Sequence, residues 1–215
     1  MKVQVQYYII HNGDEYRKNK MVQLLTENGV NMNDIKWILH PNKNEITVEM
    51  ASQLTSKYLK KGYISCTYKH YLSLKDIVEN KYEYAVIMED NIGKIYSNIP
   101  ERLNKFLEQL PSDWDILFDS KWCSYKTIQE EKVIDEKIVY KKSNEITKFC
   151  HGGSRVAQFY FLNLNCATKL YENYLPFDNA PDFWMNSLFR KLNINSYWSE
   201  PAIIETRLNH VSSTN

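Results

Sequence analysis

Tyr84-Ala85-Val86-Ile87-Met88-Glu89-Asp90-Asn91 is the segment with the clearest structural pattern in the chain. Its first five residues form an uninterrupted apolar run, as a β-strand buried on both faces requires. The run ends in two carboxylic acids and an amide. In open sheets with parallel strands, ligands bind in the crevice beyond the carboxyl ends of the strands. The stretch therefore predicts a central strand with a polar site at its tip.

Strand and helix patterns alternate on both sides of this stretch. The alternation predicts an α/β fold, with a mostly parallel sheet and helices on both faces. No linker or internal repeat interrupts it, so we expect a single domain over residues 1–215, with a polar excursion near 121–150 that holds a hairpin around 133–140. Ser65 and Asn163 are expected to cap helices. The other predicted strands are 3–10, 35–39, 114–118, 159–162, 197–198 and 203–204, and the predicted helices are 17–28, 47–61, 65–80, 99–110, 165–174 and 183–192.

Composition limits the classes of function. The chain has 215 residues, 43% of them hydrophobic, and a net charge of +1. This content supports a packed core, and the near-zero charge provides no overall field to attract nucleic acid or an anionic membrane. The alternating N-terminus lacks the apolar run of a signal peptide, and no stretch approaches the roughly 18 apolar residues of a membrane span.

The four cysteines are scattered and include no Cys-x-x-Cys pair. Neither a disulfide framework nor a cysteine-based zinc framework is therefore expected. The reducing cytoplasm is the expected compartment, and it would be the host cytoplasm if the source is viral.

The acids at residues 89–91 suggest a cation. Burying a carboxylate without a partner is costly. Mn²⁺ or Mg²⁺ would offset that cost, since these ions take one or two carboxylates and leave their other positions to phosphate oxygens and water. A cation there would stabilise a departing nucleoside diphosphate as a Lewis acid. The three residues alone leave a second interpretation open, in which they only begin a polar loop or cap a helix.

Segments spread over most of the chain from about residue 60 to 205 resemble glycosyltransferase family 25, which contains lipooligosaccharide and collagen galactosyltransferases. Their order and spacing carry the resemblance, since no single segment is specific. The segments are Gly62-Tyr63-Ile64-Ser65-Cys66-Thr67-Tyr68-Lys69-His70, the stretch 84–91, Leu110-Pro111-Ser112-Asp113-Trp114-Asp115, residues 157–170, Pro181-Asp182-Phe183-Trp184, and Tyr197 to Pro201.

The resemblance implies a GT-A fold and one domain that binds a nucleotide-sugar donor, usually a UDP-hexose, with Mn²⁺. It also implies transfer of galactose or glucose, with inversion, to a glycan, glycoprotein or hydroxylysine-type acceptor. The sequence departs from the family pattern at Asn91, where a second aspartate is usual, and at Lys69 and Ser65. These departures support a second hypothesis, a catalytically weak or inactive binding or partner module with the same fold.

The candidate site residues have alternative structural roles. Asp90 is the first candidate metal ligand, with Asn91 beside it, and His210 is either a third ligand or a solvated side chain. Asp182 is the candidate general base, since inverting transfer needs a carboxylate to accept the proton of the acceptor hydroxyl; its structural alternative is a helix N-cap. Three of the candidate donor-binding residues have structural alternatives. Arg17 could lie on a helix surface, His70 could be a core histidine, and Gly153 could be part of a turn. The candidate donor-binding residues are His11, Asn12, Arg17, Lys69, His70, Glu89 and Gly153.

Overall fold

A computed structural model describes residues 3–121, 136–147 and 152–206. A seven-stranded sheet with strand order β2-β1-β3-β7-β5-β8-β6 forms its centre, and β4 and β9 form a separate two-stranded sheet. Strands β1, β2, β3, β5 and β8 point in one direction, and β6 and β7 in the opposite direction. The sheet is therefore mostly parallel, as predicted.

The strands and helices have the following bounds. The strands are β1 (Gln6–Ile10), β2 (Ile35–Ile38), β3 (Tyr84–Glu89), β4 (Ile92–Ile95), β5 (Ile116–Phe118), β6 (Val139–Lys142), β7 (Phe159–Asn163), β8 (Ser196–Ser199) and β9 (Ile204–Thr206). The α-helices are α1 (Glu15–Glu27), α2 (Val48–Leu54), α3 (Lys61–Asn80), α4 (Ile99–Gln109), α5 (Leu164–Asn173) and α6 (Pro181–Leu192), and short 3₁₀ turns span Met32–Asp34 and Lys43–Glu45.

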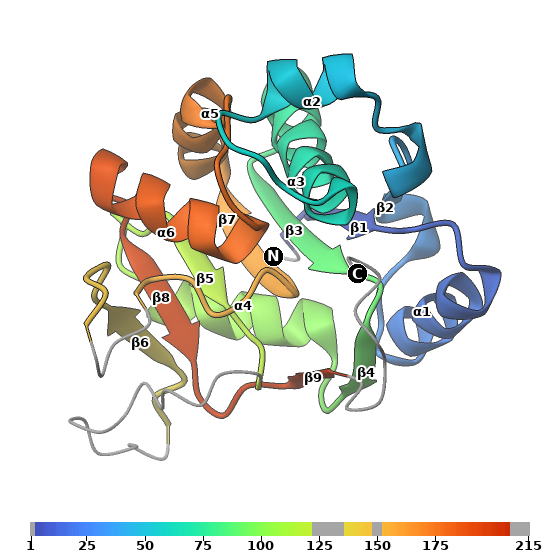
Figure 1. Cartoon of the computed structure of the whole chain (residues 1–215). Helices are drawn as coiled ribbons and strands as arrows, with labels where there is room; N and C mark the ends of the chain where they lie inside the picture. The colour runs from blue at the N-terminus through green and yellow to red at the C-terminus, as the bar shows by residue number, and fades with distance from the viewer. Residues whose placement is uncertain (1–2, 122–135, 148–151, 207–215) are drawn as a thin grey trace.

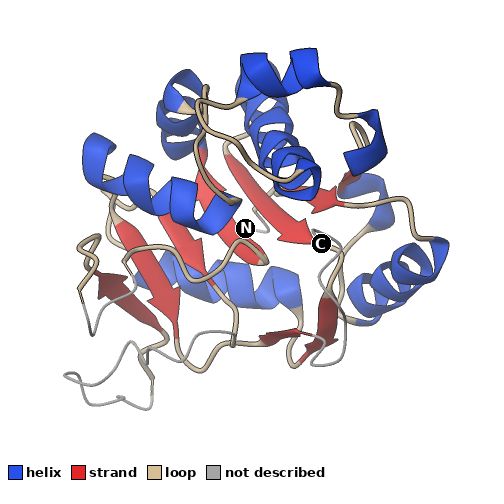
Figure 2. Cartoon of the chain, viewed as in Figure 1, coloured by secondary structure: helices blue, strands red, loops and turns tan. Residues whose placement is uncertain are grey.

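Helices cover both faces of the central sheet (Figures 1 and 2). One hydrophobic core joins the sheet to α2, α3, α5 and α6, and the other joins it to α1 and α4. Strand β3 contributes to both, because successive side chains of a strand point to opposite faces. Ala85 and Ile87 pack in the first core, and Val86 and Met88 pack in the second. The apolar run 84–88 is thus explained by burial on both faces.

Several local predictions are confirmed. Asn163 caps α5, since its side chain accepts a hydrogen bond from the Cys166 amide at 2.8 Å. Pro100 stands in the first turn of α4, where its missing N–H costs no helical hydrogen bond. In the described ranges, no helix has both the length and the apolar character needed to cross a membrane.

Other predictions are wrong, each because of a contact distant in sequence. Ser65 is not a cap: α3 already begins at Lys61, and the Ser65 hydroxyl donates to the Pro41 carbonyl at 2.6 Å. The helix predicted over 47–61 ends at Leu54, where the chain bonds to the backbone of Phe177.

The polar excursion predicted near 121–150 is described only in part. Residues 122–135 and 148–151 lie outside the described residues. Within 136–147, β6 pairs antiparallel with β8 and stands last in the strand order of the described sheet, whereas the predicted hairpin around 133–140 extends outside the described residues.

Candidate functional site

The carboxyl ends of β1 and β3 bring the first group of candidate residues together. The two strands are parallel neighbours, and their register places Ile10 opposite Glu89. The next residues, His11 and Asp90, therefore leave the sheet side by side. The His11 Nδ1–H donates to Asp90 Oδ2 at 2.7 Å, and the Asn12 amide donates to the same oxygen at 3.2 Å.

Arg17 completes the environment of Asp90. Asp14 caps α1 by accepting from the Arg17 amide, so the helix begins directly after β1 and Arg17 lies in its first turns. The Arg17 guanidinium donates to Asp90 Oδ1 at 2.9 Å. The side chains of Arg17 and Asp90 are only 10% and 7% exposed. Arg17 is therefore a buried partner of Asp90 rather than a helix-surface residue.

The pKa of Asp90 reflects these contacts. Burial alone would raise the pKa of the carboxyl group, but the His11 hydrogen bond, the charge of Arg17 and the Asn12 amide outweigh it and lower the pKa below 3.8. Asp90 is therefore ionised at neutral pH. Both of its oxygens have protein partners.

Glu89 faces the other side of the sheet and meets α3. Its Oε1 lies 3.6 Å from His70 Nε2 and 3.7 Å from Cys66 Sγ, and its Oε2 accepts from Asn91 Nδ2 at 3.2 Å. The Asn91 Oδ1 is buried and has no hydrogen-bond partner within the described part of the chain. The adjacent acids Glu89 and Asp90 thus serve different partners, because strand alternation sends them to opposite faces.

Lys69 links α3 to the end of β1. Its Nζ donates to the His11 carbonyl at 2.7 Å and to Asn42 Oδ1 at 2.8 Å. The side chain is almost fully buried, and burial lowers the pKa of the ammonium group despite the nearby Asp90 and Glu45 carboxylates. Lys69 therefore lies beside the His11–Asp90 pair.

Asp182 is the second residue of α6 and not its N-cap. The cap is Ala180, which makes no side-chain capping bond. The Asp182 carbonyl accepts from the Ser154 hydroxyl at 3.0 Å. The loop before α6 is tied to α3, since the Thr67 hydroxyl donates to the Asn179 carbonyl at 3.3 Å. Asp182 therefore lies in the first turn of a helix whose preceding loop contacts α3 at Thr67, the residue after Cys66.

Another candidate, Gly153, does not join this group. Gly153 packs against the side chains of Asn144 and Ser196, where a Cβ would clash, and its carbonyl accepts from the Trp198 indole at 2.8 Å. The close approach accounts for the glycine, in agreement with the structural alternative. His210 lies outside the described residues.

Two buried or half-buried residues, Cys66 and Asp119, are not among those predicted from the sequence. Cys66 lies four positions before His70, a helical spacing that puts both on one face and could have been noticed. Asp119 follows β5 and is fully buried. It accepts from the Ser199 hydroxyl and from the Ile203 amide at 2.8 Å, and burial raises its pKa although these bonds act against the rise. Asp119 thus fastens the segment before β9 to the sheet.

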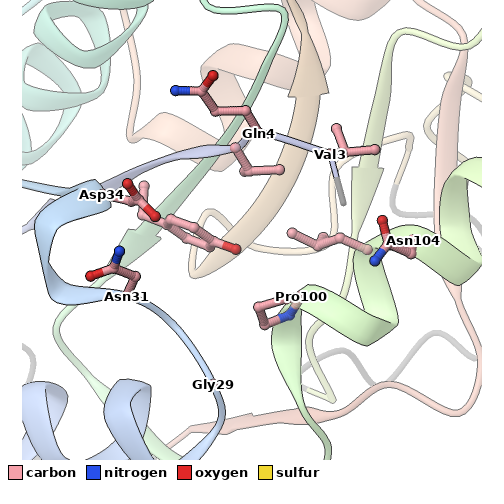
Figure 3. Close-up of a pocket in the computed structure, with 10 residues that line it drawn as sticks. Val3, Gln4, Gly29, Asn31, Asp34, Pro100 and Asn104 are labelled. Carbon is pink, nitrogen blue, oxygen red and sulfur yellow. The ribbon is translucent and has the colours of Figure 1, made fainter. Parts of the chain in front are cut away.

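A pocket of about 260 Å³ lies away from this group, at the amino-terminal end of β1 (Figure 3). It is bounded by the segment before β1, the turn after α1 and the start of α4. Because it is at the opposite end of the strand from His11, it does not form part of the candidate site. Its lining includes Val3, Gln4, Tyr7, Asn31, Pro100 and Asn104.

Two solved structures are similar to this chain over most of its length. The structure is similar to a glycosyltransferase involved in the glycosylation of the major capsid of PBCV-1, with a TM-score of 0.51 and 9% sequence identity over 96% of this chain and 94% of that chain. A197 from STIV gives a TM-score of 0.49 and 13% identity over 98% of this chain and 97% of that chain. The first likeness supports the predicted GT-A-like α/β fold. No curated protein matches the sequence significantly.

A family comparison covers most of the sequence. Residues 6–185 match the sequence model described as glycosyltransferase family 25 (LPS biosynthesis protein). The matched region begins at β1 and extends into α6, so it contains the ends of β1 and β3, all of α3 and Asp182. The resemblance noted from separate segments is thereby confirmed, and the chain belongs to glycosyltransferase family 25.

Proposed function

We propose that this glycosyltransferase moves a hexose, galactose or glucose, from a UDP-linked donor to a hydroxyl group of a glycan, glycoprotein or hydroxylysine-type acceptor, with inversion and with Mn²⁺ or Mg²⁺. The observation that carries the proposal is that His11 and Arg17 bond to Asp90 at the carboxyl end of β3, while Lys69 bonds to the His11 carbonyl beside them. In parallel sheets this edge is where ligands bind. It lies within the region that matches the family.

The oxygens near Asn91 fit a hard cation. Asn91 Oδ1 is buried without a hydrogen-bond partner among the described residues, and Glu89 supplies a carboxylate beside it. We assign the first contacts to these two residues. Cation binding by Asp90 stays a prediction, and it would use lone pairs that His11, Asn12 and Arg17 do not occupy. His210 stays the predicted third ligand. When bound, the cation would neutralise charge on the leaving diphosphate.

The protein's own groups would hold the donor and accept the proton. We assign His11, Asn12, Arg17 and Lys69 to the donor side of the crevice, where Asp90 fixes the first three. Asp182 is the proposed general base, which removes the proton from the acceptor hydroxyl as it attacks the anomeric carbon. The hydrogen bond from Thr67 of α3 to Asn179, in the loop before α6, supports this role. It holds the start of α6 beside the helix that contacts Glu89.

Replacing Asn91 by aspartate tests the position of the cation. The substitution sets a second carboxylate against Glu89 Oε2 in place of the amide donor. Without a cation we expect a loss of about 1 kcal/mol from the missing hydrogen bond and the repulsion. With Mn²⁺ we expect a larger stabilisation than in the wild type, since hard cations prefer charged oxygens. Thermal melts with and without Mn²⁺ measure both effects.

Asn91→Ala is the matched control, because it removes the same hydrogen bond without adding charge. Equal Mn²⁺ shifts in Asn91→Asp and Asn91→Ala would place the cation elsewhere.

A thermal-shift panel tests the donor class. UDP-, GDP- and CMP-sugars are each added with and without Mn²⁺. A ligand that binds only the native state stabilises it by about 2.7 kcal/mol at one hundred times its Kd. We expect UDP-hexoses with Mn²⁺ to raise the melting temperature most. The proposal would be abandoned if no nucleotide sugar shifted the melt under either condition.

A catalytically silent binding module is the second candidate function. Asn91 in place of a carboxylate favours it, as does the engagement of both Asp90 oxygens by protein groups. Such a module would respond to UDP-hexoses in the melting panel but would not release UDP from them.

A further inference from the structure

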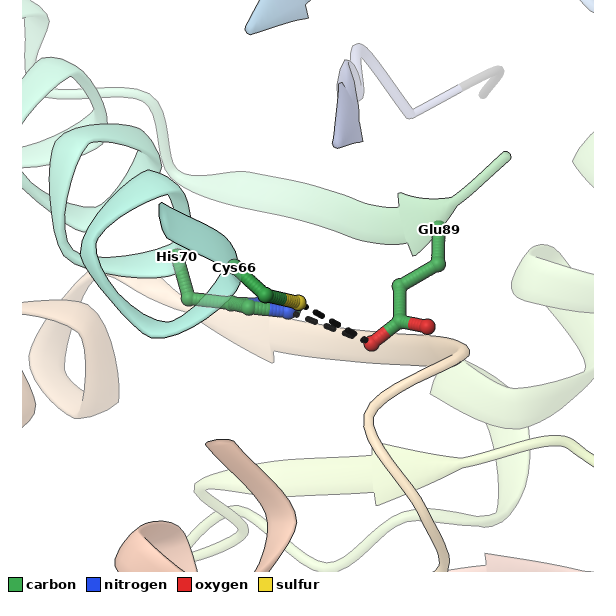
Figure 4. Close-up of side chains that lie close together, drawn as sticks. All are labelled: Cys66, His70 and Glu89. Carbon is green, nitrogen blue, oxygen red and sulfur yellow. Dashed lines mark hydrogen bonds and ion pairs between the residues drawn. The ribbon is translucent and has the colours of Figure 1, made fainter. Parts of the chain in front are cut away.

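Three potential metal ligands converge between α3 and the tip of β3 (Figure 4). They are Cys66 Sγ, His70 Nε2 and Glu89 Oε1, and all three atoms lie within 4.8 Å of one another. Cys66 and His70 are four residues apart in α3, so both side chains lie on the helix face that meets the sheet. Glu89 reaches them because it shares the strand face of Ala85 and Ile87, which pack in the same core as α3.

The spacing suits a tetrahedral cation. Zinc bonds of about 2.0–2.3 Å in a tetrahedron place ligand atoms roughly 3.3–3.8 Å apart. The distances from Glu89 Oε1 to His70 Nε2 and to Cys66 Sγ are 3.6 and 3.7 Å. A cation would therefore fit between the three atoms with only small side-chain movements. A thiol–carboxylate hydrogen bond alone would not require the histidine nitrogen to approach the same oxygen.

The setting of His70 is an independent observation. The side chain is fully buried, and its Nε2 has no hydrogen-bond partner within the described ranges. A buried nitrogen in this state has lost its hydration without replacement. On the other side of the ring, Nδ1 lies 2.7 Å from the Tyr160 hydroxyl. Metal-bound histidines are usually held in this way through their second nitrogen, which fixes the ring and leaves Nε2 free for the ion.

We propose that Cys66, His70 and Glu89 bind a thiophilic divalent cation of the zinc type, with a fourth position left to water. A thiolate and an imidazole prefer Zn²⁺ or Co²⁺ to Mn²⁺ or Mg²⁺, so the site differs from the proposed oxygen site at Asn91. Glu89 can serve both, since Oε1 faces Cys66 and Oε2 faces Asn91. The site does not depend on the proposed transfer activity.

The state of the thiol is consistent with a site that forms on binding. Burial, and then the Glu89 carboxylate, raise the pKa of Cys66, so without a cation the S–H donates to Glu89 Oε1. A bound cation would displace this proton to solvent and take the thiolate as its ligand.

Cobalt titration tests the site without nucleotide. The protein used carries Cys123→Ser and Cys150→Ser, so that Cys66 and Cys166 are its only thiols. We expect one equivalent of Co²⁺ to produce the near-ultraviolet thiolate-to-cobalt charge-transfer absorption of a tetrahedral site. The band should be absent in Cys66→Ser. In Glu89→Gln, the affinity for Co²⁺ should be at least tenfold lower. It should persist in Cys166→Ser, which removes the buried thiol of α5.

Thermal melts provide the second measurement. Zn²⁺ should raise the melting temperature of the starting protein and of Cys166→Ser, but not that of Cys66→Ser. The proposal is overturned if no charge-transfer band appears, if the band survives Cys66→Ser, or if Mn²⁺ and Mg²⁺ stabilise the nucleotide-free protein as much as Zn²⁺ does. Cys66→Ser and Glu89→Gln change the ligands with little change in size, so loss of binding in a protein that still melts cooperatively reports on the site.

Discussion

Replacing Asp90 by alanine is expected to lower the free energy of unfolding by about 3–5 kcal/mol. The change removes the partner of two buried groups, the guanidinium of Arg17 and the ring of His11. Neither could regain its hydration without opening the end of β1. Urea unfolding followed by tryptophan fluorescence measures the loss.

The matched control is Asp178→Ala, which breaks the exposed pair between Asp178 and Lys57 at 2.6 Å. Exposed ion pairs contribute about 0–1 kcal/mol, so this variant should remain close to the wild type. Equal stabilities for Asp90→Ala and Asp178→Ala would show that the buried contacts of Asp90 do not hold the site together.

Acidic pH should reduce the contribution of Asp90 to the free energy of unfolding. The pKa of Asp90 in the folded protein lies below the ordinary value of 3.8. Its carboxylate therefore contributes its full stabilisation at pH values above that ordinary pKa. The contribution is lost as the pH falls through the lowered pKa. The stability gap between the wild type and Asp90→Asn should therefore narrow below about pH 4. A gap that stayed constant down to pH 2 would contradict the assigned interactions.

Replacing Asp182 by asparagine is expected to reduce transfer by about 10²–10⁴-fold, the usual contribution of a general base. The amide has the same size but cannot accept the proton of the acceptor hydroxyl. Donor binding should be retained, because Asp182 lies on α6 and the proposed donor contacts come from the loop after β1, from α1 and from α3. Steady-state transfer rates and the UDP-hexose melting shift measure the two properties separately.

Asp178→Asn is the control for this prediction, since it makes the same chemical change four residues earlier, before α6. It should keep both transfer and binding. Retained turnover in Asp182→Asn would remove the assigned base, whereas loss of the donor-induced shift would indicate a binding or structural role.

The centre of the fold could be predicted from sequence because burial on both faces leaves a clear signal. The run 84–88 had to be apolar to fill two cores at once. Asn163 was recognisable as a cap because its role depends on a residue only three positions later. The sequence marked His11 as a donor-binding candidate, but its hydrogen bond to Asp90 is a finding of the structure.

The errors arose where distant partners decide the structure. Strand β4 was missed because its four residues include Gly93 and, in the described part of the chain, pair with β9, more than one hundred residues later. Ser65 has the residue type of a cap, yet its hydroxyl bonds to Pro41 across the fold.

The same limit applies to the candidate site. Sequence indicated that acids stand at the tip of β3, but it did not show which helix covers each face. Glu89 therefore could not be assigned to α3, or Asp90 to α1, until the packing was known. For this reason Cys66 was not recognised as a partner of Glu89, although its spacing from His70 was visible.

The most direct test of the proposed function is UDP release from UDP-galactose and UDP-glucose, measured with and without Mn²⁺ and beside Asp182→Asn. We expect UDP release that requires the cation, rises when a hydroxyl acceptor is supplied, and loses the acceptor-dependent part in Asp182→Asn. Release no faster than in buffer for every donor, from a protein whose melting temperature the donors still raise, would contradict catalysis and leave a binding module.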